Sequence, residues 1–167
     1  ICKSIQEAQH IDKTIYLGKI TPRKGQSRYC HLEGIHIIGP CDNGTPRIAN
    51  YQGAWTREQV YNNLGDYGNL LLLSEGEADP LVVKEAMIAG LGVVINETSG
   101  KNLDRNQDFI SIVPDSRCDD LEYIQCVLDN NRKIAYQKRE LIRNYAREHY
   151  SWQPLIARYI EVIRFYL

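Results

Sequence analysis

The segment LLLLSEGEADPLVVKEAMIAGLGVVIN, which runs from Leu70 to Asn96, decides the fold. Its four leucines form a continuous apolar run, which is typical of a short strand buried on both faces. After a polar loop, Asp79-Pro80 predicts a helix start, with Asp79 as the N-cap and Pro80 at the first helical position. Gly90 ends this helix, and the valines and isoleucine that follow form the next buried strand. The segment therefore predicts a strand–helix–strand crossover.

Two carboxylates follow the first predicted strand. Glu77 is in the loop, and Glu85 lies one turn into the helix, below the amides of Leu81 and Val82. The free amides of a first helical turn favour an anion, and helical side chains tilt toward the N-terminus. Glu85 should therefore point toward whatever the amides bind, and sugar hydroxyls would let a carboxylate lie beside a phosphate. Two solvated surface carboxylates are the alternative interpretation.

The whole segment resembles the donor-binding motif of retaining glycosyltransferases of the GT-B fold, family 4. In that family a serine precedes the pattern E-G-F-G-L-V-x-x-E-A-M-x-x-G-x-P-V-V. The residues that match are Ser74, Glu77, Leu81, Val82, Glu85, Ala86, Met87, Gly90, Val93 and Val94. The resemblance implies the C-terminal half of a GT-B fold, which is an α/β domain with a Rossmann-like, doubly wound parallel sheet.

The resemblance extends over most of the chain. The stretch IYLGKITPRKG resembles the family's first strand and phosphate loop, V-G-R-x-x-x-x-K-G, and its Lys19 and Lys24 are five residues apart, as the two basic residues of the family are. The stretch YQGAWTREQVYNNL resembles the F-L-G-x-x-x-x-x-E-L segment. Its Thr56 and Gln59 predict a capping box at the start of a helix. HYSW, near the end, resembles the F-S-W before the last helix.

Several positions depart from the family pattern. Lys19 stands where the family has Arg, so it would act as a point charge rather than as a bidentate donor. Ala78-Asp79-Pro80 replaces G-F-G, and Pro80 lacks an N–H with which to approach a sugar. The connections after Gly25 and after Pro40 leave room for only a turn or two, where the family has a full helix.

The resemblance implies catalysis by three residues. Lys19 and Lys24 would neutralise the diphosphate as it becomes the leaving group. Glu77 would hold hydroxyls of the donor sugar and orient it for attack. The expected reaction is the retaining transfer of a hexose from a nucleotide-diphospho sugar.

The resemblance also implies a set of donor-binding residues. Glu85 would hold the ribose hydroxyls, the main chain of Leu81 and Val82 would bind phosphate, and the main chain from Gly53 to Trp55 would bind the base. Asp79 would supply a substitute acceptor for a sugar hydroxyl, although capping the helix is the favoured interpretation. The expected donor-binding set is Gly18, Gly53, Trp55, Asp79, Leu81, Val82 and Glu85.

Length and composition indicate one domain over residues 1–167, and hydrophobic periodicity predicts a helical segment from about 119. The expected strands are 14–18, 35–39, 48–52, 70–73, 93–96 and 109–113, and the expected helices are 57–64, 81–89, 120–130, 132–149 and 153–166. Two apolar stripes of the last helices should face the core, and they comprise Ile134, Leu141, Ile142 and Tyr145, then Leu155, Tyr159 and Ile163.

Composition indicates an ordinary globular domain without a nucleic-acid or anionic-membrane footprint, because the net charge is −1. No apolar run reaches the roughly 20 residues of a membrane span, and we expect a cytoplasmic location. The five cysteines, which lack C-x-x-C spacing, predict reduced thiols rather than a metal site or a disulfide framework. We expect metal-independent donor binding without a cofactor.

The first residue is Ile1 rather than Met, and we expect the chain to be part of a longer protein. The resemblance implies a missing N-terminal domain that binds the acceptor, which would be a glycan, a lipid or a protein. A fragment of this kind should bind donor but transfer poorly. Alternatives are a GT-B fold epimerase or phosphorylase, a non-catalytic nucleotide-binding module, and an interaction domain with an empty cleft.

Overall fold

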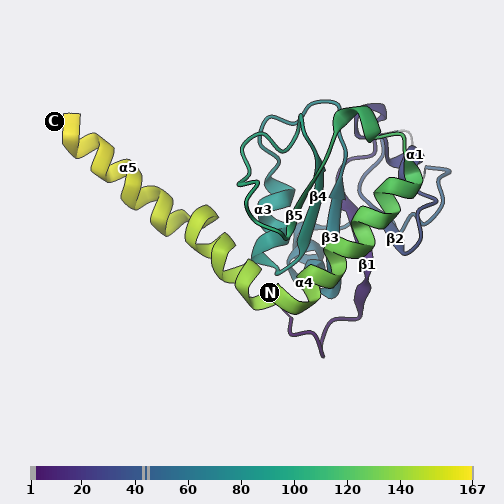
Figure 1. Cartoon of the computed structure of the whole chain (residues 1–167), viewed down its shortest axis with the longest axis horizontal. Coiled ribbons are helices and arrows are strands. Elements are labelled where there is room, and N and C mark those ends of the chain that lie inside the picture. Colours follow the sequence, from purple (N-terminus) through teal and green to yellow (C-terminus); the bar gives the residue numbers. More distant parts are fainter. Residues whose placement is uncertain (1–2, 43, 45, 167) are drawn as a thin grey trace.

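A computed structural model describes residues 3–42, 44 and 46–166. A five-stranded, all-parallel sheet forms the centre of the domain, in the order β2-β1-β3-β4-β5 (Figure 1). The strands are β1 (His10–Leu17), β2 (Ile35–Ile38), β3 (Tyr67–Leu72), β4 (Gly92–Asn96) and β5 (Ile110–Val113). The helices are α1 (Gln26–Tyr29), α2 (Arg57–Asn63), α3 (Leu81–Ile88), α4 (Leu121–Tyr150) and α5 (Trp152–Tyr166), with 3-10 turns at Pro22–Lys24, Leu64–Asp66 and Asp115–Arg117. The predicted α/β class with a doubly wound parallel sheet is confirmed.

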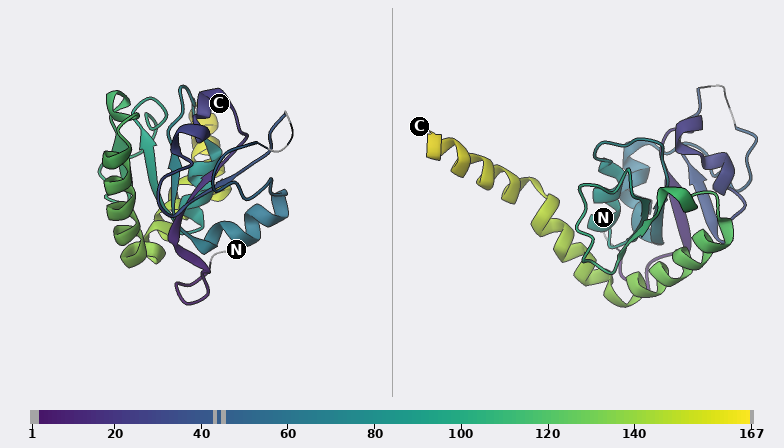
Figure 2. Two further views of the ribbon diagram at one scale, coloured as in Figure 1. Left: turned by 90° about the vertical axis from the view of Figure 1, so that its right-hand side faces the viewer. Right: turned by 45° about the horizontal axis from the view of Figure 1, so that its top comes forward.

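The strand order reverses between β1 and β3. The chain moves from β1 to β2 on one side, whereas β3, β4 and β5 follow one another on the other side. Helices α2 and α3 lie on one face of the sheet and α4 on the other (Figure 2). In open sheets of this kind, ligands bind at the carboxyl ends of the strands where the order reverses. The ends of β1 and β3 are therefore the place to look for a site.

A buried polar network fixes α4 across the sheet. Asn131 of α4 donates to the carbonyls of Val93 and Phe109 at 3.2 and 3.0 Å. Asn69 of β3 donates to the carbonyl of Leu128 at 3.0 Å and to the side-chain oxygen of Asn131 at 3.1 Å. Because these amides are fully buried, the hydrogen bonds set the position of α4 as well as satisfying the polar groups.

The predicted strand 48–52 is wrong. Only Tyr51 forms a bridge, to Ile37, although the segment exchanges two backbone hydrogen bonds of 2.9 Å with the edge of β2. Asn50 has a φ of 59°, in the left-handed region, which interrupts an extended run. Its side chain donates to the carbonyl of Cys30 at 2.9 Å. The two helices expected between 120 and 149 are joined in α4, whose break is a kink at Lys138, where the torsions are non-helical, and not near residue 131 as expected.

The predicted ends of the crossover helix are partly confirmed. The expected Asp79 cap is wrong, because Pro80 occupies the N-cap position without a side-chain cap. Asp79 instead accepts from the ammonium of Lys84 at 2.5 Å. The expected end is confirmed, since Gly90 adopts a φ of 87° and Leu91 donates back to the carbonyl of Ala86. The capping box of α2 is confirmed as well.

The expected core-facing stripe of the last helix is wrong. Helix α5 extends away from the domain (Figures 1 and 2), and its Leu155, Tyr159 and Ile163 are all exposed. On α4, Ile142 is fully buried, whereas Leu141 is also exposed. The periodicity correctly indicated a helix with an apolar face, but that face does not pack against the domain. No helix among the described residues is long and apolar enough to span a membrane.

The cysteines of the described chain carry free thiols, as expected. These are Cys30, Cys41, Cys118 and Cys126, and the fifth, Cys2, lies outside the described residues.

Candidate functional site

Two loops meet at the carboxyl ends of β1 and β3, the Lys24 loop (residues 18–25) and the Glu77 loop (residues 74–80). The amide of Glu75 donates to the carbonyl of Arg23 at 2.9 Å, and the guanidinium of Arg23 donates to the carbonyl of Gly76 at 2.7 Å. The hydroxyl of buried Tyr16 bonds to the carbonyl of Lys24 and lies 3.3 Å from that of Leu73. Burial raises the pKa of Tyr16 well above its ordinary value, so the hydroxyl keeps its proton. These contacts fix the two loops against each other.

A cavity of about 240 Å³ lies between these loops and the N-terminal halves of α2 and α3. It is lined by Leu17, Gly18, Lys24, Arg57, Val60, Glu77, Pro80, Leu81, Val82 and Glu85. Six residues that the sequence placed in a site are therefore brought together, namely Gly18, Lys24, Glu77, Leu81, Val82 and Glu85.

The Lys24 ammonium and the Glu77 carboxylate form an ion pair of 3.1 Å in this cavity. Both side chains are about one quarter exposed, at 22% and 24%. The ammonium also lies against Gly18, where a Cβ would come within 3.1 Å of it. A glycine at this position thus lets the cation approach the end of β1 closely.

The first two residues of α3, Leu81 and Val82, line the same cavity. Among the hydrogen bonds of the described residues, none engages the N–H groups of Leu81 and Val82, whereas the amide of Val83 donates to the carbonyl of Pro80 at 3.2 Å. Unpaired amides at the first turn, together with the helix dipole, favour a bound anion. With Lys24 beside them, they form a site suited to phosphate.

Glu85 lies one turn below these amides and is paired with Arg57 of α2. The guanidinium Nη2 is 3.1 Å from Oε1 of Glu85, and Nε donates to the hydroxyl of Tyr61 at 2.7 Å. Sequence reasoning missed Arg57 as a site residue. The capping box at Thr56 fixes Arg57 as the first residue of α2, but this local signal does not indicate its pairing with Glu85 of α3.

No protein-family model and no curated protein sequence matches this chain. Solved structures do match it. One is TarM, at 18% identity and a TM-score of 0.69, over 96% of this chain and 36% of that one. Sucrose-phosphate synthase from Thermosynechococcus elongatus matches at 15% identity and a TM-score of 0.69, over 92% and 45%. The GtfA/B complex matches at 12% identity and a TM-score of 0.68, over 97% of this chain and 37% of that one.

The chain has the fold of the C-terminal domain of a GT-B glycosyltransferase. It spans a little over a third of the TarM and GtfA/B chains and under half of the sucrose-phosphate synthase chain. The expected GT-B resemblance is confirmed at the level of the fold. A crystal structure of a mutant of S. aureus TarM, which also matches this chain, contains UDP.

Other residues expected in a GT-B donor site lie outside the cavity. Lys19 is half exposed and paired with Asp42 at 2.8 Å. Asp79 is turned to Lys84, so its carboxylate is not directed at the cavity. The carbonyl of Gly53 accepts from the amide of Gly39 at 3.0 Å, and the half-buried ring of Trp55 packs 6.2 Å from that of Tyr67. Their expected contacts with donor stay predictions.

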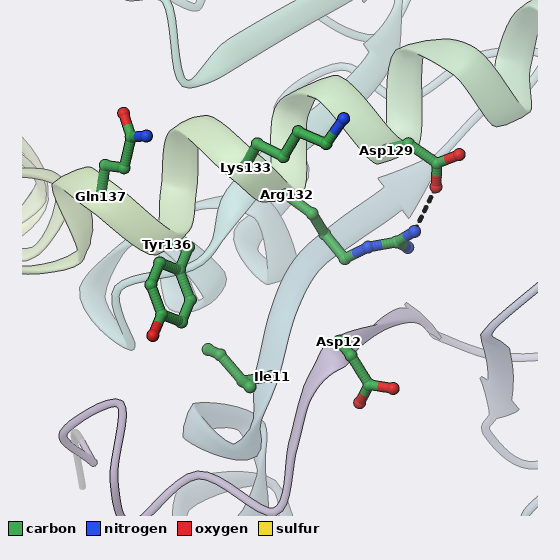
Figure 3. A pocket seen from close by; sticks show the side chains of 7 residues that line it. All are labelled: Ile11, Asp12, Asp129, Arg132, Lys133, Tyr136 and Gln137. Carbon is green, nitrogen blue, oxygen red and sulfur yellow. Dashed lines mark hydrogen bonds and ion pairs between the residues drawn. The ribbon is translucent and has the colours of Figure 1, made fainter.

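A larger cavity of this GT-B-like domain lies elsewhere. It has a volume of about 520 Å³, lies between β1 and α4, and includes Asp12, Lys133 and Tyr136 in its lining (Figure 3). Its Arg132 is already bound by Asp129 and by the hydroxyl of Thr14. This open groove has neither free helix amides nor a position at the strand ends, so it lacks the features of the smaller cavity.

Proposed function

We propose that this domain binds a nucleotide-diphospho sugar and provides the donor half of a retaining glycosyltransferase. The observation that supports the proposal most directly is the cavity at the ends of β1 and β3. There the Lys24 ammonium and the amides of Leu81 and Val82 surround a space that also contains the carboxylates of Glu77 and Glu85. TarM, which has a similar fold, binds UDP in a mutant form, in keeping with this proposal.

Each group has a role in the proposed complex. The diphosphate would lie on the α3 amides and Lys24, where positive charge also stabilises the leaving group. Lys19 would join it by exchanging Asp42 for phosphate. Glu85 would accept from the ribose hydroxyls, and Glu77 would accept from the sugar and hold it for attack.

The remaining parts of the proposal concern the base, the acceptor and the second domain. The base would bind along the main chain from Gly53 to Trp55. A hexose would pass, with retention, to a glycan, lipid or protein bound by a separate N-terminal domain. Donor binding needs no metal in this scheme, because lysines and helix amides supply the positive charge. Among the described residues, no group of three or more His, Cys, Asp or Glu could hold a metal ion.

A non-catalytic nucleotide-binding module is the second candidate. One observation favours it: the site cations are already compensated, Lys24 by Glu77, Lys19 by Asp42 and Arg57 by Glu85. Such a site has a smaller excess of positive charge than free lysines would provide. The turn of Asp79 away from the cavity also removes one possible contact with a sugar.

Titration calorimetry with UDP, GDP and ADP, each with and without EDTA, tests the proposal. We expect at least one nucleoside diphosphate to bind, with the same affinity in EDTA. Lys24→Gln should weaken that binding about tenfold, since charge-assisted hydrogen bonds contribute roughly 1.5–3 kcal/mol. Lys133→Gln, in the larger cavity between β1 and α4, is the matched control and should bind like wild type. Loss of binding on chelation would contradict the metal-free claim, and no binding at all would contradict the donor-site proposal.

A further inference from the structure

Arg57 is a cation of the candidate site to which the sequence motifs assign no role. It occupies the first position of α2 and reaches across to α3, where it pairs with Glu85. It lines the candidate cavity and also a second cavity, of about 250 Å³, between α2 and α3. The Arg57–Glu85 pair therefore forms the boundary between these two spaces.

The guanidinium is held in place although it is exposed. Its Nε donates to the Tyr61 hydroxyl at 2.7 Å, and its centre lies 4.9 Å from the centroid of the Tyr61 ring. These contacts come from the next turn of the same helix, so they fix the side chain along α2. The hydrogen bond to Tyr61, and then the charge of Glu85, raise the pKa of Arg57, which stays cationic.

The negative charge of Glu85 is compensated by the guanidinium of Arg57. A carboxylate next to free helix amides and Lys24 occupies a place where an anion should bind, and it would repel a diphosphate. Among the described residues, the Glu85 side chain has no other ion-pair or hydrogen-bond partner than Arg57. A carboxylate has about four lone-pair positions, so a single contact at Oε1 leaves acceptor capacity for other donors.

We infer that Arg57 is a positioning residue for nucleotide binding: it neutralises and orients Glu85, so that this carboxylate can accept ribose hydroxyls beside a bound diphosphate. The inference rests on the proposed function, because it takes the ligand to be a nucleoside diphosphate. Arg57 does not touch the phosphates in this arrangement. Its effect passes entirely through Glu85.

A double-mutant cycle tests this. Arg57→Gln, Arg57→Lys, Glu85→Gln and the double variant Arg57→Gln/Glu85→Gln are titrated with the nucleoside diphosphate that wild type binds best among UDP, GDP and ADP. We expect Arg57→Gln to weaken binding up to about fivefold, the size of an exposed ion pair. Arg57→Lys should restore most of the loss, because it keeps the charge. In the Glu85→Gln background, Arg57→Gln should change affinity less than about twofold.

The matched control is Arg28→Gln. Arg28 forms a similar exposed ion pair of 3.0 Å, with Asp119, and does not line the candidate cavity. The Arg28→Gln variant should bind nucleotide as wild type does, and circular dichroism should show that every variant is folded.

Three results would overturn the inference. Unchanged affinity in Arg57→Gln would make the pair a simple surface contact. An equal loss with and without Glu85 would mean that Arg57 binds the ligand directly. Wild-type protein that binds no nucleoside diphosphate would overturn the proposed function itself, and this outcome is distinct from the other two, in which wild type does bind.

Discussion

The ammonium of Lys24 and the carboxylate of Glu77 lie 3.1 Å apart and join the Lys24 loop to the Glu77 loop. The sequence assigned these residues to two separate tasks, diphosphate neutralisation for Lys24 and sugar positioning for Glu77. Their contact places the two tasks side by side. It also means that Lys24 must give up or share its ion pair with Glu77 when a diphosphate binds.

The first prediction follows from this contact and concerns Glu77→Gln. Removing the carboxylate charge releases Lys24, so nucleoside diphosphate affinity should rise, by up to about fivefold for a partly exposed ion pair. Transfer by a full-length enzyme should fall, because the sugar loses an acceptor that orients it. Calorimetry measures the first effect and turnover at saturating donor the second. Glu75→Gln, in the same loop but outside the cavity, should change neither. Weaker nucleotide binding in Glu77→Gln would contradict the assignment of Glu77 to the sugar.

The second prediction distinguishes ribose from phosphate recognition. Glu85→Gln should weaken nucleoside diphosphate binding about tenfold, since a hydrogen bond to a charged acceptor contributes roughly 1.5–3 kcal/mol. Inorganic pyrophosphate has no ribose, and its affinity should stay constant or increase because the negative charge of Glu85 is removed. Both affinities come from calorimetry on the same preparations. An equal loss for the two ligands would show that Glu85 does not act on the ribose.

Sequence patterns predicted most of the residues that line the candidate cavity, because helical spacing is rigid. Once a helix was predicted to begin at Pro80, Glu85 had to lie about one turn below the amides of Leu81 and Val82, and the structure has this arrangement although the helix begins at Leu81. The five-residue spacing of Lys19 and Lys24 was less informative. Both residues lie in an irregular loop, where spacing does not fix direction, and only Lys24 lines the cavity.

The errors have local physical causes. The Asp79 carboxylate could accept a hydrogen bond either from the helix amides or from the Lys84 ammonium. Pro80 occupies the N-cap position, and Asp79 pairs with Lys84. The pairing of Arg57 with Glu85 joins two helices that are distant in sequence, and no local pattern reports such a contact. Amphipathic periodicity in α5 indicated an apolar face, but periodicity does not say which surface that face meets.

The third prediction concerns the ends of β1 and β2. Gly39 has a φ of 154°, and a Cβ on it would lie only 1.9 Å from the carbonyl oxygen of Gly18. Gly39→Ala should therefore lower the free energy of unfolding by at least about 2 kcal/mol, from backbone strain and overpacking. Gly34→Ala is the control, because Gly34 has a φ of 69° but its nearest atom would be 3.5 Å away. Urea denaturation of both variants checks the difference, and equal losses would contradict the close approach of the two strands.

The fourth prediction is a pH dependence of stability that comes from His36. Burial, and then the charges of His10 and Lys13, lower the pKa of His36 below its ordinary value of 6.5. The unfolded chain then binds a proton more readily than the folded one, so stability is fully present above about pH 6.5 and is lost as the pH falls below it. Denaturation at pH 7.5 and 5.5 should show a smaller difference for His36→Asn than for wild type. His31→Gln, at an exposed position, should behave as wild type does. The same pH dependence in all three proteins would exclude His36 as its source.

The fifth prediction concerns α5, whose apolar side chains are exposed on a helix that extends away from the domain (Figure 1). Trp152, Tyr159 and Phe165 are 77%, 67% and 83% exposed, so their removal takes little apolar surface out of a core. A chain that ends at Ser151 should keep its free energy of unfolding within about 1 kcal/mol of the full chain, since stabilisation scales with the apolar area that is buried. It should also associate less at high concentration, because an exposed apolar stripe favours self-association. Urea denaturation and sedimentation velocity measure the two effects. A loss of several kcal/mol, or of cooperative unfolding, would show that α5 contributes to the core of the domain in solution.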